Sequence, residues 1–155
     1  MSESLYGGVL ELLGKSERDA GLIQYTNSLG IRHPIARPPR SEKETNVELP
    51  HQALELLFTL GSELPDSSRY ADGEMVLSTF FIHLGAPGLT LAELPFGIDM
   101  SMTREQARAH LGEPEWTSHG SLKNDRWVVG DKRMLLSFTT DEQRIRQVSI
   151  SKIFE

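Results

Sequence analysis

The chain has 155 residues, of which 38% are hydrophobic and 25% charged, and it carries a formal net charge of −6 with no cysteine. This length fits one domain with a single core, or two small halves that share one. The absence of cysteine excludes disulfides, thiol nucleophiles and thiolate metal sites. The negative charge argues against a broad phosphate-binding surface, and so against nucleic acid as a partner.

The sequence shows neither a membrane segment nor an export signal. No apolar run approaches the roughly 20 residues that a membrane span needs. The N-terminal stretch lacks a basic region and places Glu11 inside its apolar part, unlike a secretory signal. We therefore expect a cytoplasmic protein with no membrane partner.

Acidic residues are concentrated in the first part of the chain. Residues 1–100 carry 14 acids and 7 bases, whereas residues 101–155 carry 8 acids and 9 bases. The segment 41–74 alone holds eight acids and two bases. We predict that this segment faces a basic partner, and the alternative is that its acids only keep the protein soluble.

Two helices are expected near the N-terminus. Apolar residues recur at helical spacing from Leu5 to Leu13, and Gly14 follows where a helix-ending glycine belongs. Ser16 is placed to cap a second helix that ends at Gly30. The three prolines of the segment 32–40 then predict an extended loop.

Three strands are expected next, over Glu44–Leu49, Ala53–Leu60 and Glu74–His83. In the second, apolar residues alternate with a mixed row, which places Glu55 on the face away from the apolar side chains. A helix is the alternative for this segment. The flanking proline and glycine, and the β-branched and aromatic residues of the third segment, favour strands.

The best-marked element is a short helix after Thr103. Thr103 and Gln106 have the spacing of a capping box, in which each residue bonds the other's backbone N–H. Gly112 and Pro114 then end the helix. We predict a helix of about two turns, too short to persist without packing against neighbouring structure.

A second meander follows, with strands over Asp125–Gly130, Arg133–Thr139 and Arg144–Ile153 joined by short hairpin connections. The fold class predicted is α+β: two helix-plus-antiparallel β-meander halves forming one curved sheet, with helices packed on one face. We expect a single domain over residues 1–155. An internal duplication, dividing the chain at about 1–90 and 91–155, and two unrelated pieces are both compatible with this order of elements.

Motifs for chemistry are missing from the sequence. The five histidines lack metal-ligand spacing, and no phosphate-binding glycine loop or nucleophile motif occurs. We therefore predict no catalytic residue, no cofactor, no metal and no enzymatic activity. Two tryptophans flank the polar loop 117–124: Trp127 is expected in the core, and Trp116 is left open between packing and binding.

The stretches LPFGIDMSMTREQARAHLGEPEW, DRWVV and RMLLSFTTDEQRIRQVSI together resemble immunity-type proteins of bacterial polymorphic toxin systems, of the contact-dependent or type VI-like kind. They are also similar to the helix-plus-β-meander repeat of the superfamily of β-lactamase inhibitory protein and small outer-membrane assembly lipoproteins. The resemblance is clearest over Leu94–Ile153 and weaker over Ala53–His83. The chain departs from the exported members of that superfamily in lacking cysteine and an export signal.

The resemblance implies a cytoplasmic immunity protein that neutralises a cognate toxin by blocking its active site or substrate cleft. A basic nuclease-like effector would suit an acidic blocker, because the acids can mimic its phosphate substrate. The alternative is a non-catalytic peptide- or protein-binding adaptor, or a chaperone-like module, that uses the open sheet face. The predicted partner-binding residues are Glu48, Glu55, Glu63, Asp66, Asp72, Glu74 and Trp116.

Overall fold

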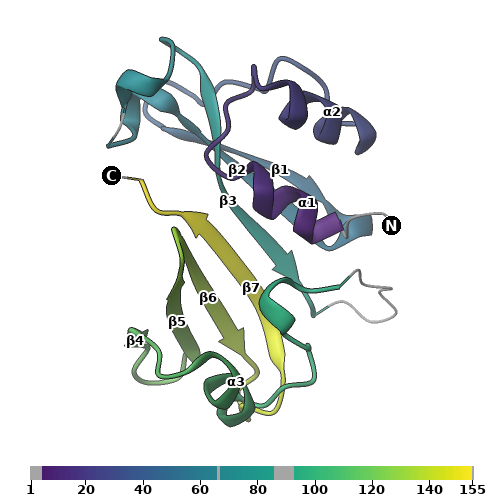
Figure 1. Cartoon of the computed structure of the whole chain (residues 1–155), viewed down its shortest axis with the longest axis vertical. Coiled ribbons are helices and arrows are strands. Elements are labelled where there is room, and N and C mark those ends of the chain that lie inside the picture. Colours follow the sequence, from purple (N-terminus) through teal and green to yellow (C-terminus); the bar gives the residue numbers. More distant parts are fainter. Residues whose placement is uncertain (1–4, 66, 86–92, 155) are drawn as a thin grey trace.

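Seven strands form one antiparallel sheet in the order β1-β2-β3-β7-β6-β5-β4 (Figure 1). The computed structural model describes residues 5–65, 67–85 and 93–154. The strands are β1 Glu44–Leu49, β2 Leu54–Leu60, β3 Met75–His83, β4 Trp116–Thr117, β5 Asn124–Val129, β6 Lys132–Phe138 and β7 Ile145–Lys152. The helices are α1 Leu5–Leu12, α2 Ala20–Ser28 and α3 Arg104–Leu111. Among the described residues, no helix is both long enough and apolar enough to span a bilayer.

The sheet consists of two meanders joined at their last strands. Strands β1 to β3 form the first meander and β5 to β7 the second, and β3 pairs with β7 through five antiparallel residue pairs. Figure 1 shows α1 and α2 beside the first half and α3 beside the second. The predicted α+β class, with two helix-plus-meander halves in one sheet, is confirmed. A duplication behind these halves stays a prediction.

One face of the sheet forms the core. Leu54, Leu56 and Phe58 are at most 1% exposed, so the segment is a strand with one buried face rather than a helix. The same face continues across the paired strands with Phe80 and Ile82. Apolar residues of the three helices belong to this core, among them Tyr6, Val9, Leu22 and Ala107.

The start of the second helix differs from the prediction. Helix α2 begins at Ala20, where the Asp19 carboxylate accepts a hydrogen bond from the Leu22 N–H. The expected cap, Ser16, instead forms a β-bridge with Val76. The backbone on either side of it bonds to β3, so tertiary pairing replaces helix here.

The capping box of α3 is confirmed. The Thr103 hydroxyl accepts from the Gln106 N–H at 3.1 Å, and the Thr103 N–H donates to the Gln106 side-chain oxygen at 2.9 Å. The helix closes at Gly112, whose φ of 91° favours glycine. Ala107 packs into the core and holds the two turns against the sheet.

Replacing Thr103 by alanine removes one of these bonds and should cost about 1 kcal/mol. For a domain of this size the melting temperature should fall by about 3 °C, as measured by circular dichroism. Thr140→Ala, in an exposed turn, is the matched control and should melt like the wild type. Equal melting of both variants would contradict a role for the cap in stability.

Candidate protein-binding surface

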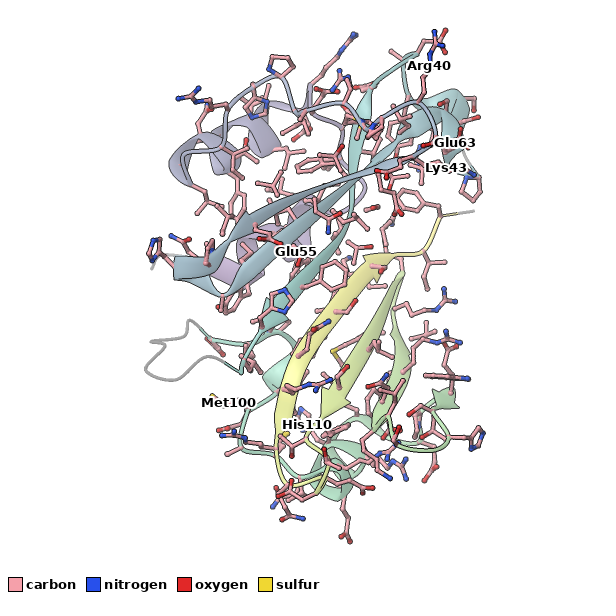
Figure 2. All side chains as sticks on the ribbon, turned by 180° about the vertical axis from the view of Figure 1, so that it is seen from behind. Arg40, Lys43, Glu55, Glu63, Met100 and His110 are labelled. Carbon is pink, nitrogen blue, oxygen red and sulfur yellow. The ribbon has the colours of Figure 1, made fainter. Side chains whose placement is uncertain are left out.

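The side chains that alternate with the core residues form the second face of the sheet. We call it the open face, because the helices pack on the other one. Figure 2 looks onto this face, with Glu55 on the first meander and turned toward the viewer. Several of its residues are at least partly exposed, including Leu57, Phe81 and Leu135. The open face therefore combines accessible apolar and polar side chains on a continuous sheet.

The strand registers align seven side chains of the open face into one line across the whole sheet. Each neighbour in this line is a directly opposed pair in the register of two adjacent strands. We call this line the transverse row. From β1 to β4 it runs Glu48, Glu55, Phe81, Ser149, Leu135, Arg126 and Trp116.

One end of the transverse row is acidic. Glu48 and Glu55 are directly opposed on β1 and β2. Like charges in this position destabilise a sheet, so the pair favours contact with a cation. The Glu55 carboxylate lies 2.9 Å from the His83 Nε2 and also accepts from the Asn46 amide. Glu48, Glu55 and His83 border a hollow of about 350 Å³ that Pro50 helps to line.

The other end carries an aromatic ring and two arginines. Trp116 is 42% exposed, and the Arg126 guanidinium lies 5.3 Å from the centroid of its ring, in cation–π geometry. Both Arg126 and Arg133 bond one carboxylate oxygen of Glu115, at 2.8 and 3.2 Å. Two cations share one anion, so this end retains positive charge. Trp127, by contrast, is 3% exposed and packs in the core as predicted.

Strand β4, which carries Trp116, is held by a buried ionic cluster. Asp125 is fully buried, and Arg104 and Arg108 each donate to both of its carboxylate oxygens, at 2.7 to 3.1 Å. The Thr117 hydroxyl of β4 donates to the same carboxylate at 2.6 Å. We call these four residues the Asp125 cluster. It ties α3, β4 and β5 together and so positions the basic end of the open face.

Hydrogen bonding sets the charge state of Asp125. Burial alone would raise the pKa of its carboxyl group, but the hydrogen bonds from Arg108, Arg104 and Thr117 outweigh this effect. The pKa of Asp125 therefore lies far below its ordinary range. The carboxylate stays ionised and balances the two guanidinium groups.

The structure brings three of the predicted partner-binding residues, Glu48, Glu55 and Trp116, into the transverse row. Glu63 and Asp72 are exposed but lie outside the row, in the connection between β2 and β3. Glu63 pairs with Lys43 at 3.5 Å, and Figure 2 shows the two together at the edge of the first meander. Asp66 lies outside the described residues.

Glu74 differs most from its predicted role. It is only 7% exposed, and its carboxylate accepts from the Ala71 N–H at 2.6 Å. A side-chain hydrogen bond from Ser16 lowers the pKa of Glu74 further than its burial raises it. The carboxylate fixes the turn before β3 and the N-terminal segment beside it, which leaves little of it for a partner.

The other members of the row were not among the predicted partner-binding residues, namely Phe81, Ser149, Leu135 and Arg126. Strand alternation alone gives the face of each residue but not the register between strands. Only the observed pairing, including bulges in β2–β3 and β6–β7, aligns them.

Comparison with known proteins gives no relative: no family model, curated protein or solved structure matches this chain. Within the described part of the chain, no group of three or more His, Cys, Asp or Glu side chains is arranged to hold a metal ion. The open face is therefore interpreted from its own chemistry.

Replacing Asp125 by asparagine keeps the shape of the side chain and removes its charge. Arg104, whose side chain is 10% exposed, then lacks its main counter-charge. We expect the free energy of unfolding at pH 7 to fall by about 3 kcal/mol or more, as measured by urea denaturation. Asp72→Asn, at an exposed turn, should change it by less than about 0.5 kcal/mol.

The effect of Asp125→Asn should also depend on pH. The folded pKa is depressed, so the stabilisation by the carboxylate is fully present above the unfolded pKa of about 3.9 and is lost as the pH falls through the folded pKa. The stability difference between wild type and variant should stay constant from pH 7 to about pH 5 and shrink below about pH 4. A difference that disappears by pH 6 would contradict the assigned charge state.

Proposed function

We propose that this protein is a cytoplasmic immunity protein that binds a cognate antibacterial toxin and blocks its active site or substrate cleft. Two observations support the proposal. The first is the sequence resemblance to immunity-type proteins over the second half of the chain. The second, which carries the argument here, is the directly opposed pair Glu48 and Glu55 on an accessible sheet face.

The charge of this region suits a basic toxin. Glu48, Glu63 and Asp72 are exposed, and Glu55 adds a partly buried carboxylate at the hollow of the open face. A nuclease-like toxin has a cationic cleft for phosphates, which such a surface can occupy in place of the substrate. Surface charges of this kind act mainly by accelerating association, and salt weakens that effect.

A growth-rescue assay tests the proposal. Toxin domains found by sequence in neighbouring genes are each expressed in the cytoplasm of a sensitive bacterium, with and without this protein. Growth should be restored only with the protein present, and the two purified chains should form a stable complex. Absence of both protection and complex formation would overturn the proposal.

Replacing Glu48 and Glu55 together by lysine should slow association with that toxin at least tenfold at low salt, as measured by stopped-flow or surface kinetics. The difference in association rate between wild type and variant should become smaller as the ionic strength rises. Glu11→Lys with Glu105→Lys makes the same charge change at two exposed helix positions and is the control. Equal association rates for both double variants would place the toxin contact elsewhere.

The alternative function, an adaptor for peptides or proteins, is favoured by a different observation. Phe81 and Leu135 place partly exposed apolar side chains in the middle of the open face. In that function the apolar residues would contribute more than the acids. Phe81→Ser would then abolish binding while the lysine double variant retained it, and the rescue assay would show no protection.

A further inference from the structure

Two copies of the transverse row are complementary when one of them runs in the opposite direction across the sheet. Ser149 on β7 is its middle residue. One step to either side lie two apolar residues, Phe81 and Leu135, and two steps away lie an anion and a cation, Glu55 and Arg126. If a second copy of the row is laid over the first in reverse order, Glu55 meets Arg126, Phe81 meets Leu135, and Ser149 meets Ser149, so the five central residues have chemically suitable partners. The outermost residues, Glu48 and Trp116, meet each other.

We propose that the open face binds the open face of a second copy of this chain, about a two-fold axis that runs along β7. This axis reverses the order of the row across the sheet and leaves the position of each residue along its strand unchanged. Glu55 of each copy then faces Arg126 of the other, and Phe81 faces Leu135. The two Ser149 residues meet at the axis.

The neighbouring row on the same face is also complementary to a reversed copy of itself. It is centred on Ser151, which pairs with Thr79 on β3 and with Arg133 on β6. The next residues outward are Leu57 and Val128, the latter 46% exposed. Under the proposed axis these two apolar residues face each other, and the Thr79 hydroxyl faces an arginine. Both rows therefore fit the same symmetry operation.

The charges of the two ends differ in sign. Glu48 and Glu55 make the first end negative, whereas Arg126 and Arg133 exceed the single charge of Glu115 at the other. The proposed symmetry brings each negative end against a positive one, twice in each dimer. An arrangement in which the second row is not reversed would place the two negative ends against each other and the two positive ends against each other. Repulsion between like charges disfavours it.

The centre of the face allows close approach. Ser149 and Ser151 are small, so the two β7 strands can come to the spacing of about 10 Å that stacked sheets adopt. Aligned sheets pack with their mean strand directions within about 30° of each other. A two-fold axis along β7 keeps the two β7 strands parallel, which lies within that range.

The size of the face sets the expected affinity. Seven strands about 4.8 Å apart span roughly 29 Å, and about five residues along each strand give roughly 500 Å² for each copy. The total of roughly 1,000 Å² lies at the lower limit for specific interfaces. Interfaces of this size are typical of weak or transient complexes, so we expect dimer formation to depend on the protein concentration. The dimer itself requires no toxin, but it covers Glu55, which the proposed toxin contact also uses, so the dimer and the toxin complex exclude each other.

Sedimentation equilibrium of the full chain from about 1 to 200 µM tests the dimer. The apparent mass should rise from the monomer value of 17.4 kDa toward twice that value. Glu55→Arg or Arg126→Glu alone opposes like charges at both contacts and should weaken self-association at least tenfold. Glu105→Arg, on helix α3, is the control and should leave it unchanged.

Mixing the two single variants gives the decisive result. A mixed dimer has two contacts between residues 55 and 126. At one contact the side chains introduced by Glu55→Arg and Arg126→Glu face each other with opposite charges. At the other contact the native Arg126 faces the native Glu55. Each variant alone should stay monomeric, while the equimolar mixture should form dimers with near-wild-type affinity. A wild type that is monomeric at 200 µM would overturn the proposal. So would a mixture that fails to associate, or an association that Glu55→Arg leaves unchanged.

Discussion

Side chains alternate between the two faces of every strand, and this constraint fixes the open face once the core is packed. A slip of one residue in any pairing would move apolar residues out of the core and polar ones into it. Leu56, Phe80 and Ile150 are fully buried, so the registers of β2, β3 and β7 cannot shift without exposing them. The transverse row is therefore a product of core packing, even though none of its members forms the core.

The two ends of the open face are supported in different ways. Glu55 stands on a central strand of the first meander, within a continuous ladder of backbone hydrogen bonds. Trp116 stands on a strand of only two residues at the sheet edge. The Asp125 cluster compensates for this short pairing, because it connects β4 to the helix as well as to β5. The position of an exposed aromatic ring thus depends on a buried carboxylate.

Much of the fold follows from local signals. The capped helix at Thr103, the positions of β1 to β3 and β5 to β7, and the outward direction of Glu55 depend on residues close together in the chain, and these predictions are confirmed. The short edge strand β4 was not predicted, because its two residues carry no strand pattern of their own. The features that were missed depend on distant partners. Ser16 pairs with Val76 rather than capping a helix, and Glu74 is drawn inward by a turn and the N-terminal segment. Asp125 resembles any surface acid until the pairing of β5 and the position of α3 bring two arginines onto it.

The seam between β3 and β7 has a consequence for how the sheet forms and opens. Within each meander the paired strands are neighbours in sequence, whereas Thr79 and Ser151, which bond across the seam, are 72 residues apart. Closing so long a loop costs entropy that the hairpins avoid, so the meanders can form before they join. The same five pairs are where the halves can separate with the least loss of local structure. Any molecule bound along the row contacts both meanders across this seam and therefore stabilises their pairing.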